Sequence, residues 1–218
     1  MNDKGNDNEI IGKFSVALGL FDYINPIFYS ITVITILVKM FGKMSTPIYA
    51  LFALGAVISL IFGFSIPTVK LIVGLGKMQF KMPVNLVSFV NTGILLSGIA
   101  LVSHVVGVRP LTLAVILLCA AAVIGFLWYK TGKFNTVAVL IGAVGYLMIY
   151  ASMITLSIRS GVILPVVLYA IAICLFVFLC LAGILSNLKN AKVHWVIEIS
   201  NVICQFSVAL ATAILLWR

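Results

Sequence analysis

The strongest constraint in this sequence is a series of long apolar runs that occupies almost the whole chain. Hydrophobic residues make up 63% of the 218 residues and charged residues only 9%, whereas soluble domains carry about a quarter charged residues. So few charged groups cannot cover the surface of a water-soluble fold. The sequence therefore predicts an all-α integral membrane protein, and it excludes a soluble monomer and a disordered chain.

Seven of the runs are candidate membrane spans, because a helix needs about 20 mostly apolar residues to cross the hydrocarbon core. Pro26, Pro47 and Pro110 stand at or near the start of three of them, where the missing N–H costs nothing. An alternative extends the second span past Pro67 to residue 76. We predict one transmembrane domain over residues 1–218, with spans at residues 25–40, 46–66, 83–106, 110–129, 136–158, 162–185 and 193–217.

The segment before the first span has a helical pattern of its own. Ile10, Phe14 and Phe21 fall on one helical face, and Asp22 lies away from that face. This pattern predicts a short N-terminal amphipathic helix over residues 10–23 that lies in the membrane interface. The alternative is a longer first spanning helix that includes this segment.

The excess of positive charge predicts an orientation. The chain has 14 Lys and Arg residues against 5 Asp and Glu, and most of the basic residues lie in the short links between spans. With seven spans, nine basic residues fall on the side of the N-terminus and five on the other. We therefore expect a protein of a bacterial-type cytoplasmic membrane, with a cytoplasmic N-terminus and an external C-terminus. The basic residues form no stripe on a polar surface, so we expect no nucleic-acid partner.

The last predicted span carries the clearest candidate site. His194, Glu198, Asn201, Gln205 and Thr212 recur at helical spacing on one face, and the other faces are apolar. Lipid cannot satisfy such groups, so the stripe must face other helices or a water-filled cavity. We predict that the first four line a substrate or ion pathway, with Glu198 as the proton- or cation-binding group and His194 as its partner.

A weaker polar face in the third predicted span adds Asn85 and Thr92 to this pathway. The alternative for both stripes is structural, because polar side chains also join membrane helices through hydrogen bonds. On that reading Glu198 would pair with Lys189 or Lys192 near the membrane surface.

Other motifs indicate packing and not chemistry. Ser59 and Gly63, and Ala138 and Gly142, have the spacing of two small residues four positions apart that allows close helix contact. The four cysteines lie inside apolar runs without CxxC spacing, and no nucleotide-binding fingerprint is present. We therefore expect no metal and no cofactor.

Two short resemblances complete the sequence evidence. Asn91 and Asn201 in the third and seventh predicted spans make the chain similar to the seven-helix sugar and vitamin carriers, although their Pro-Gln signature is absent. Residues 164–169 and 199–201 resemble the lysoplasmalogenase-like membrane enzymes, but a paired acidic residue of that family falls at Asn201. We assign the chain to neither family.

These observations favour a small-solute transporter or carrier whose polar pathway is lined by the last helix. The alternatives are a membrane enzyme that acts on a lipid, with His194 and Glu198 as an acid–base pair, and a non-catalytic subunit of a membrane complex. The expected partners are the lipid bilayer and a small-molecule or ion substrate, together with a second copy of the chain or a membrane partner subunit.

Overall fold

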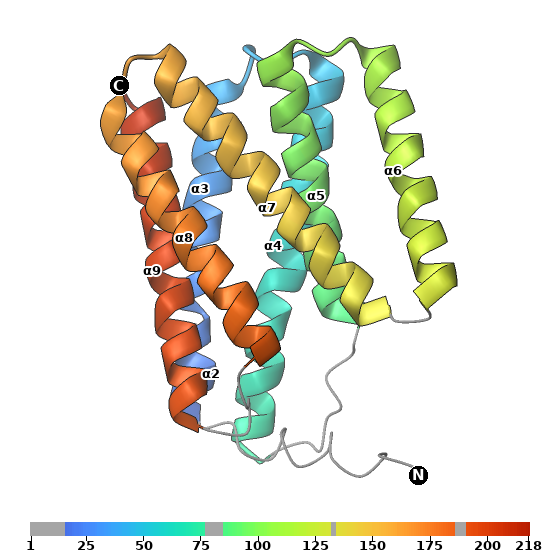
Figure 1. Ribbon diagram of the computed structural model, residues 1–218. Coiled ribbons are helices and arrows are strands. Elements are labelled where there is room, and N and C mark those ends of the chain that lie inside the picture. The colour runs from blue at the N-terminus through green and yellow to red at the C-terminus, as the bar shows by residue number, and fades with distance from the viewer. Residues whose placement is uncertain (1–15, 77–84, 132–133, 186–190) are drawn as a thin grey trace.

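The computed structural model describes residues 16–76, 85–131, 134–185 and 191–218, and these residues form a helical bundle without strands (Figure 1). Its helices are α2 (Val16–Asp22), α3 (Ile24–Met40), α4 (Thr46–Gly74), α5 (Asn85–Val106), α6 (Pro110–Thr131), α7 (Phe134–Arg159), α8 (Ile163–Leu185) and α9 (Ala191–Leu216).

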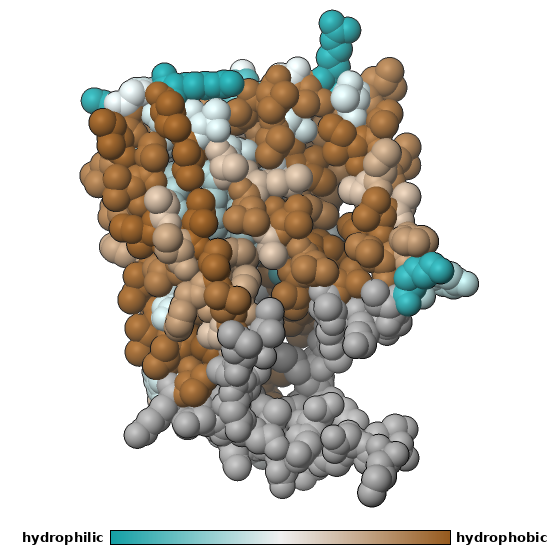
Figure 2. All heavy atoms as spheres, viewed as in Figure 1, coloured by the Kyte–Doolittle hydropathy of each residue, from teal (hydrophilic) through white to brown (hydrophobic). Residues whose placement is uncertain are grey.

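The described helices include six that are long and apolar enough to cross a membrane. These candidate spans are Val16–Met40, Thr46–Gly74, Leu86–Val106, Val137–Arg159, Ile163–Ala182 and Trp195–Leu216. Figure 2 shows that apolar side chains cover the middle of the visible face, with polar groups at its upper edge. The chain is therefore a multi-pass membrane protein. Of the seven spans expected, the fourth corresponds to α6, whose apolar part is the shorter segment Leu111–Leu127.

The N-terminal segment differs from the expected interfacial helix. α2 leads into α3 after a turn at Tyr23, and the two form one candidate span, as in the alternative of a longer first helix. Asp22, expected on the polar side of that helix, is only 7% exposed, because α2 packs against α4 and α9. Pro26 explains the turn, since it has no N–H and crowds the carbonyl group four residues earlier. Residues 10–15 lie outside the described residues.

The other helices begin and end within a few residues of the predicted limits, except at Pro67. The second predicted span ended at residue 66, whereas α4 continues through Pro67 to Gly74. Pro67 is buried among neighbouring helices, and such packing lets a membrane helix tolerate a proline. This continuation carries Lys70 into the bundle instead of into a link.

Glycine residues set the closest helix contacts. A Cβ atom at Gly55 of α4 would lie 2.5 Å from the Gly93 carbonyl oxygen of α5, and one at Gly98 of α5 would lie 2.7 Å from the Gly145 carbonyl oxygen of α7. Backbones this close leave no room for a side chain. α4, α5 and α7 are therefore joined along a continuous line, which we call the glycine seam (Gly55, Gly93, Gly98, Gly142 and Gly145).

The remaining helices surround this seam unequally. α3 packs against α9, and α9 against α8, around a core of fully buried side chains that includes Phe52, Tyr150 and Tyr169. α6 lies at the edge of the bundle beside α7 (Figure 1). Most of its side chains are exposed, such as Leu111 at 79% and Leu118 at 71%, whereas Leu113 is buried at 4%.

Candidate solute-binding site

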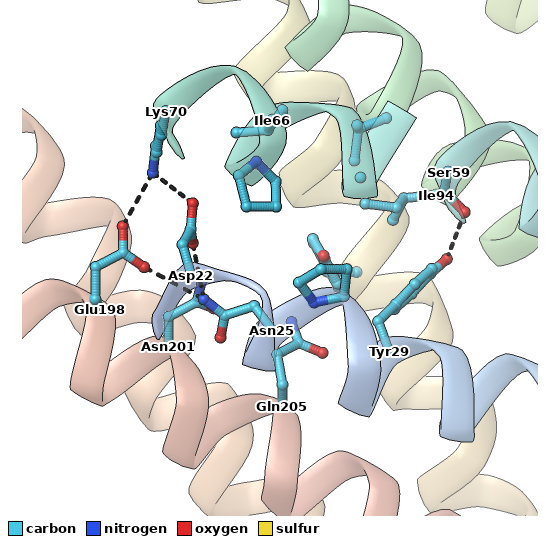
Figure 3. A pocket seen from close by; sticks show the side chains of 15 residues that line it. Asp22, Asn25, Tyr29, Ser59, Ile66, Lys70, Ile94, Glu198, Asn201 and Gln205 are labelled. Carbon is cyan, nitrogen blue, oxygen red and sulfur yellow. Dashed lines mark hydrogen bonds and ion pairs between the residues drawn. The ribbon is translucent and has the colours of Figure 1, made fainter. Parts of the chain in front are cut away.

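A cavity of about 260 Å³ lies inside the bundle, where α2, α3, α4, α5, α7 and α9 meet. Figure 3 shows polar side chains from α2, α3, α4 and α9 converging on it. Carboxylate, ammonium, amide and hydroxyl groups line one space in an otherwise apolar bundle, and the lining includes Asp22, Asn25, Tyr29, Ser59, Lys70, Glu198, Asn201 and Gln205.

Three charged side chains from three helices meet at one end of the cavity. Lys70 Nζ of α4 lies 2.6 Å from Asp22 Oδ2 of α2 and 3.3 Å from Glu198 Oε1 of α9 (Figure 3). We call these residues the charged triad. Their side chains are 16%, 10% and 11% exposed respectively, so each charge is largely withdrawn from the surface and depends on its partners.

Asn25 joins the two carboxylates from the side opposite Lys70. Its Nδ2 donates hydrogen bonds of 3.2 Å to Asp22 Oδ1 and of 3.2 Å to Glu198 Oε2. A carboxylate only accepts hydrogen bonds, so the amide nitrogen must face the two acids and the amide oxygen must face away from them. Asn25 Oδ1 is buried and has no hydrogen-bond partner within the described part of the chain.

A second buried amide oxygen at the cavity also lacks a hydrogen-bond partner in the part of the chain that the structure describes. Gln205 is 6% exposed, lines the cavity, and its Oε1 has no hydrogen-bond partner among the described residues. A buried polar atom without a partner costs about 1–3 kcal/mol. Two such oxygens at one cavity leave acceptors there for the hydrogen-bond donors of water or of another molecule.

Two prolines leave backbone oxygens near the same space. Pro26 and Pro67 both line the cavity, as does Gly63. Because proline has no N–H, the carbonyl groups of Asp22 and Gly63, each four residues earlier, lose their usual helical partner. Interrupted helices are tolerated at membrane depth where they line a cavity or are buried in protein.

The other end of the cavity is closed by packed side chains. Tyr29 Oη lies 3.0 Å from Ser59 Oγ, which itself donates to the Gly55 carbonyl oxygen. Along α4, Ser59 lies about 16 Å from Lys70 at 1.5 Å per residue. Beyond Tyr29 lies a void of about 10 Å³, lined in part by Phe52, which is 1% exposed. The charged triad thus lies toward the end of the bundle where α2 and α9 begin and α4 ends, and packed side chains separate the cavity from the bundle centre.

No family model, curated protein or solved structure matches this chain. Its function therefore has to be argued from the cavity. No group of three or more potential metal ligands occurs among the described residues. What the cavity offers is a set of charges and hydrogen-bonding atoms suited to hold a small polar molecule.

The structure brings three of the predicted pathway residues together. Glu198, Asn201 and Gln205 of α9 all line the cavity. Thr212, on the same sequence stripe, lies away from it and bonds with Tyr169 at 2.6 Å. Glu198 pairs with Lys70, a partner that the sequence alone did not suggest. The side chains of Lys189 and Lys192, the partners considered earlier, lie outside the described set.

The remaining predicted residues contribute nothing visible to this cavity. Thr92 of α5 is exposed, and its hydroxyl group donates to the Ser88 carbonyl oxygen of its own helix. The side chains of His194 and Asn85 are not among those that the structure describes, so their place in a pathway stays a prediction.

Sequence reasoning missed half of the charged and amide groups at the site. Asp22 was assigned to an interfacial helix and Lys70 to a link, and Asn25 and Tyr29 were not singled out. A signal was present, because the first two spans contain few charged or amide residues and Asn25 directly precedes a proline. Polar groups that would face lipid are expensive, so each of them called for a partner.

Proposed function

We propose that this protein is a membrane carrier for a small polar solute and that the cavity is its binding site. The observation that carries the proposal is the pair of unpartnered amide oxygens, Asn25 Oδ1 and Gln205 Oε1, beside a charged triad inside an apolar bundle. Ionisable residues within membrane helices commonly mark substrate or ion routes. A purely structural cluster would be expected to satisfy its own polar atoms.

The same proposal includes α6 as the seventh crossing. α5 and α7 run in the same direction in Figure 1, so α6 has to return the chain along the bundle between them. Its 22 residues measure about 33 Å as a helix, enough to cross the hydrocarbon core.

Seven crossings also support an N-terminus in the cytoplasm. Lys70 is now counted with the bundle instead of with a link, so nine basic residues on the N-terminal side become eight, against five on the other side. The excess still favours a cytoplasmic N-terminus. In this orientation the end of the cavity that holds the charged triad faces the cytoplasm.

A carrier must open its site to each side in turn, and the bundle offers parts for such a change. The charged triad lies near one end of the helices, and packed side chains at Tyr29 and Phe52 close the cavity toward the bundle centre; we propose that the solute enters at the triad end in this state. α3 and α4 lack backbone hydrogen bonds at Pro26 and Pro67, next to the site. We propose these positions as the points where the helices bend when the cavity opens to the other side.

Filling the cavity tests this function. Gly63 lines it, and a Cβ atom there would meet only Pro26 Cβ, at 3.9 Å, so Gly63→Leu should fold and place its side chain in the solute space. Gly125→Leu is the matched control, because a Cβ atom on α6 at that position meets nothing within 4 Å. When labelled amines, polyols or carboxylates are added outside proteoliposomes, we expect Gly63→Leu to lose uptake and Gly125→Leu to retain it.

Equal uptake by the two variants would contradict the assignment of the cavity as the solute site. The membrane-enzyme alternative would be favoured if none of the three solute classes is taken up and the detergent-purified protein turns over a lipid.

A further inference from the structure

We propose that the cavity binds a small organic cation with several N–H groups, namely a protonated amine or a guanidinium. This inference rests on the proposed solute-binding function and names the chemical class of its ligand. Three independent features of the site support it: its net charge, its unpartnered acceptors and its aromatic side chains.

The charge balance of the charged triad is negative when both of its acids are ionised. In that state Asp22 and Glu198 each carry one negative charge against the one positive charge of Lys70, which leaves a net charge of −1. Lys70 lies closer to Asp22, at 2.6 Å, than to Glu198, at 3.3 Å. Glu198 is therefore the less fully paired acid, and it is the group that a second cation would approach.

The buried side-chain atoms of the described residues that lack a hydrogen-bond partner at this cavity are both acceptors. Asn25 Oδ1 and Gln205 Oε1 have no partner among the described residues, and Pro67 deprives the Gly63 carbonyl oxygen of its usual donor. A proton on Glu198 would remove the excess charge but would leave these oxygens unsatisfied. Water would satisfy the oxygens but not the charge. A cation that carries N–H groups does both.

The size and the aromatic lining agree with this class of ligand. A cavity of about 260 Å³ is smaller than the range of about 300–1,000 Å³ that is typical of sites for drug-sized ligands. Tyr29 and Tyr146 both line it, and tyrosine rings attract ammonium and guanidinium groups. A phosphate or carboxylate ligand would instead have to displace the two acids from Lys70.

Binding of matched probes to the detergent-purified protein tests the proposal. Methylguanidinium and methylurea have nearly the same shape and differ in charge, and acetate represents anions. We expect the wild type to bind methylguanidinium at least tenfold more tightly than methylurea, by isothermal titration calorimetry. Glu198→Gln should weaken methylguanidinium binding about tenfold or more, since it removes a charged acceptor, whereas Glu198→Asp should retain most of the affinity.

Thiol labelling gives a second readout that does not depend on the choice of ligand. With the four native cysteines replaced by alanine, Asn201→Cys places a reactive thiol in the cavity, and Ser160→Cys serves as the control at an exposed position after α7. We expect the rate ratio of a cationic to an anionic methanethiosulfonate reagent to be several-fold higher for Asn201→Cys than for Ser160→Cys. Glu198→Gln should bring the two ratios together.

Equal binding of methylurea and methylguanidinium, tighter binding of acetate, or equal labelling ratios at the two positions would overturn the cation assignment. The solute-carrier function is tested separately: if Gly63→Leu abolishes uptake, that function is supported even when the cation assignment fails. Competition by phosphatidylethanolamine in nanodiscs would support the ammonium chemistry and identify a lipid headgroup as its source. Competition only by soluble amines would identify a free solute.

Discussion

The two halves of α4 use the same kind of residue for opposite purposes. Gly55, Ser59, Gly63 and Pro67 follow one another at four-residue intervals along one face of the helix. At Gly55 this face meets α5 so closely that no side chain fits, whereas at Gly63 and Pro67 it borders the polar cavity. Small residues therefore bring a partner helix close in the first half and leave space for a guest molecule in the second.

The difference shows that a motif of small residues allows another helix to come close but does not determine whether a helix or a cavity lies beside it. The Ser59 and Gly63 pair predicted close helix packing. Ser59 does pack closely, because a Cβ atom at Gly93 would lie 2.6 Å from its backbone nitrogen. Gly63 instead faces open space. What decides between the two is the course of the neighbouring helix, which the motif does not contain.

The largest loss of stability is expected when the charged triad at the end of the cavity loses its cation. Lys70→Met leaves Asp22 and Glu198 without their cation, and breaking a buried ion pair by removing one partner costs about 3–5 kcal/mol. We expect a loss of this size in the free energy of unfolding, measured by denaturant titration in detergent.

A neutralised background provides the control for that loss. Lys70→Met combined with Asp22→Asn and Glu198→Gln leaves no unpaired charge, and we expect it to recover most of the lost stability. A triple variant as unstable as Lys70→Met would show that the lysine stabilises the bundle through its packed hydrocarbon chain and not through its charge.

The next largest loss of stability is expected from a substitution in the glycine seam. In Gly93→Ala the new methyl group would lie 2.6 Å from the Gly55 carbonyl oxygen and 2.6 Å from the Ser59 backbone nitrogen, so two helix backbones would have to separate. Overpacking of this kind costs about 1–3 kcal/mol. Thermal unfolding in detergent should show the loss. An unchanged melting temperature would mean that α4 and α5 can move apart freely, and that the seam is not the rigid part of the bundle.

The fold was largely predictable because long apolar segments permit few structures. Runs such as that of α8, the most apolar of the candidate spans, can only form a helix in lipid, since every backbone group must be bonded internally. The limits of most helices followed from Pro and Gly. The course of the chain at residues 16–23 did not, because an amphipathic pattern is equally compatible with the interface and with a polar cavity inside the bundle.

The candidate site was predictable only on α9. Glu198, Asn201 and Gln205 lie on one helix, so their spacing alone places them on a common face. Asp22 and Lys70 are 48 residues apart on different helices, and their pairing depends on how α2 and α4 pack. No periodicity within one helix contains that information.

A smaller effect is expected when one tyrosine hydroxyl group is removed, either in the closed core or at the cavity. Tyr169 Oη bonds with Thr212 Oγ1 at 2.6 Å, and Tyr29 Oη with Ser59 Oγ at 3.0 Å. Interhelical hydrogen bonds in membrane proteins contribute about 0.6 kcal/mol on average. We expect Tyr169→Phe to cost about this much stability without changing ligand binding, measured by unfolding and calorimetry. Tyr29→Phe should cost a similar amount and also weaken binding, and equal binding by the two variants would place Tyr29 outside the site.

The smallest change in stability gives the sharpest comparison, because the Gly→Ala substitution made in the glycine seam is repeated at the cavity. In Gly63→Ala the methyl group would meet only Pro26 Cβ at 3.9 Å, an ordinary contact, and alanine favours a helix over glycine by about 0.5–1 kcal/mol. We expect Gly63→Ala to unfold at the same temperature as the wild type or slightly above it, whereas Gly93→Ala unfolds below it. Since the added methyl group occupies the cavity, ligand binding should weaken while stability does not. A destabilised Gly63→Ala would mean that α4 is packed as tightly at Gly63 as at Gly55, and the space assigned to a solute would belong to the protein.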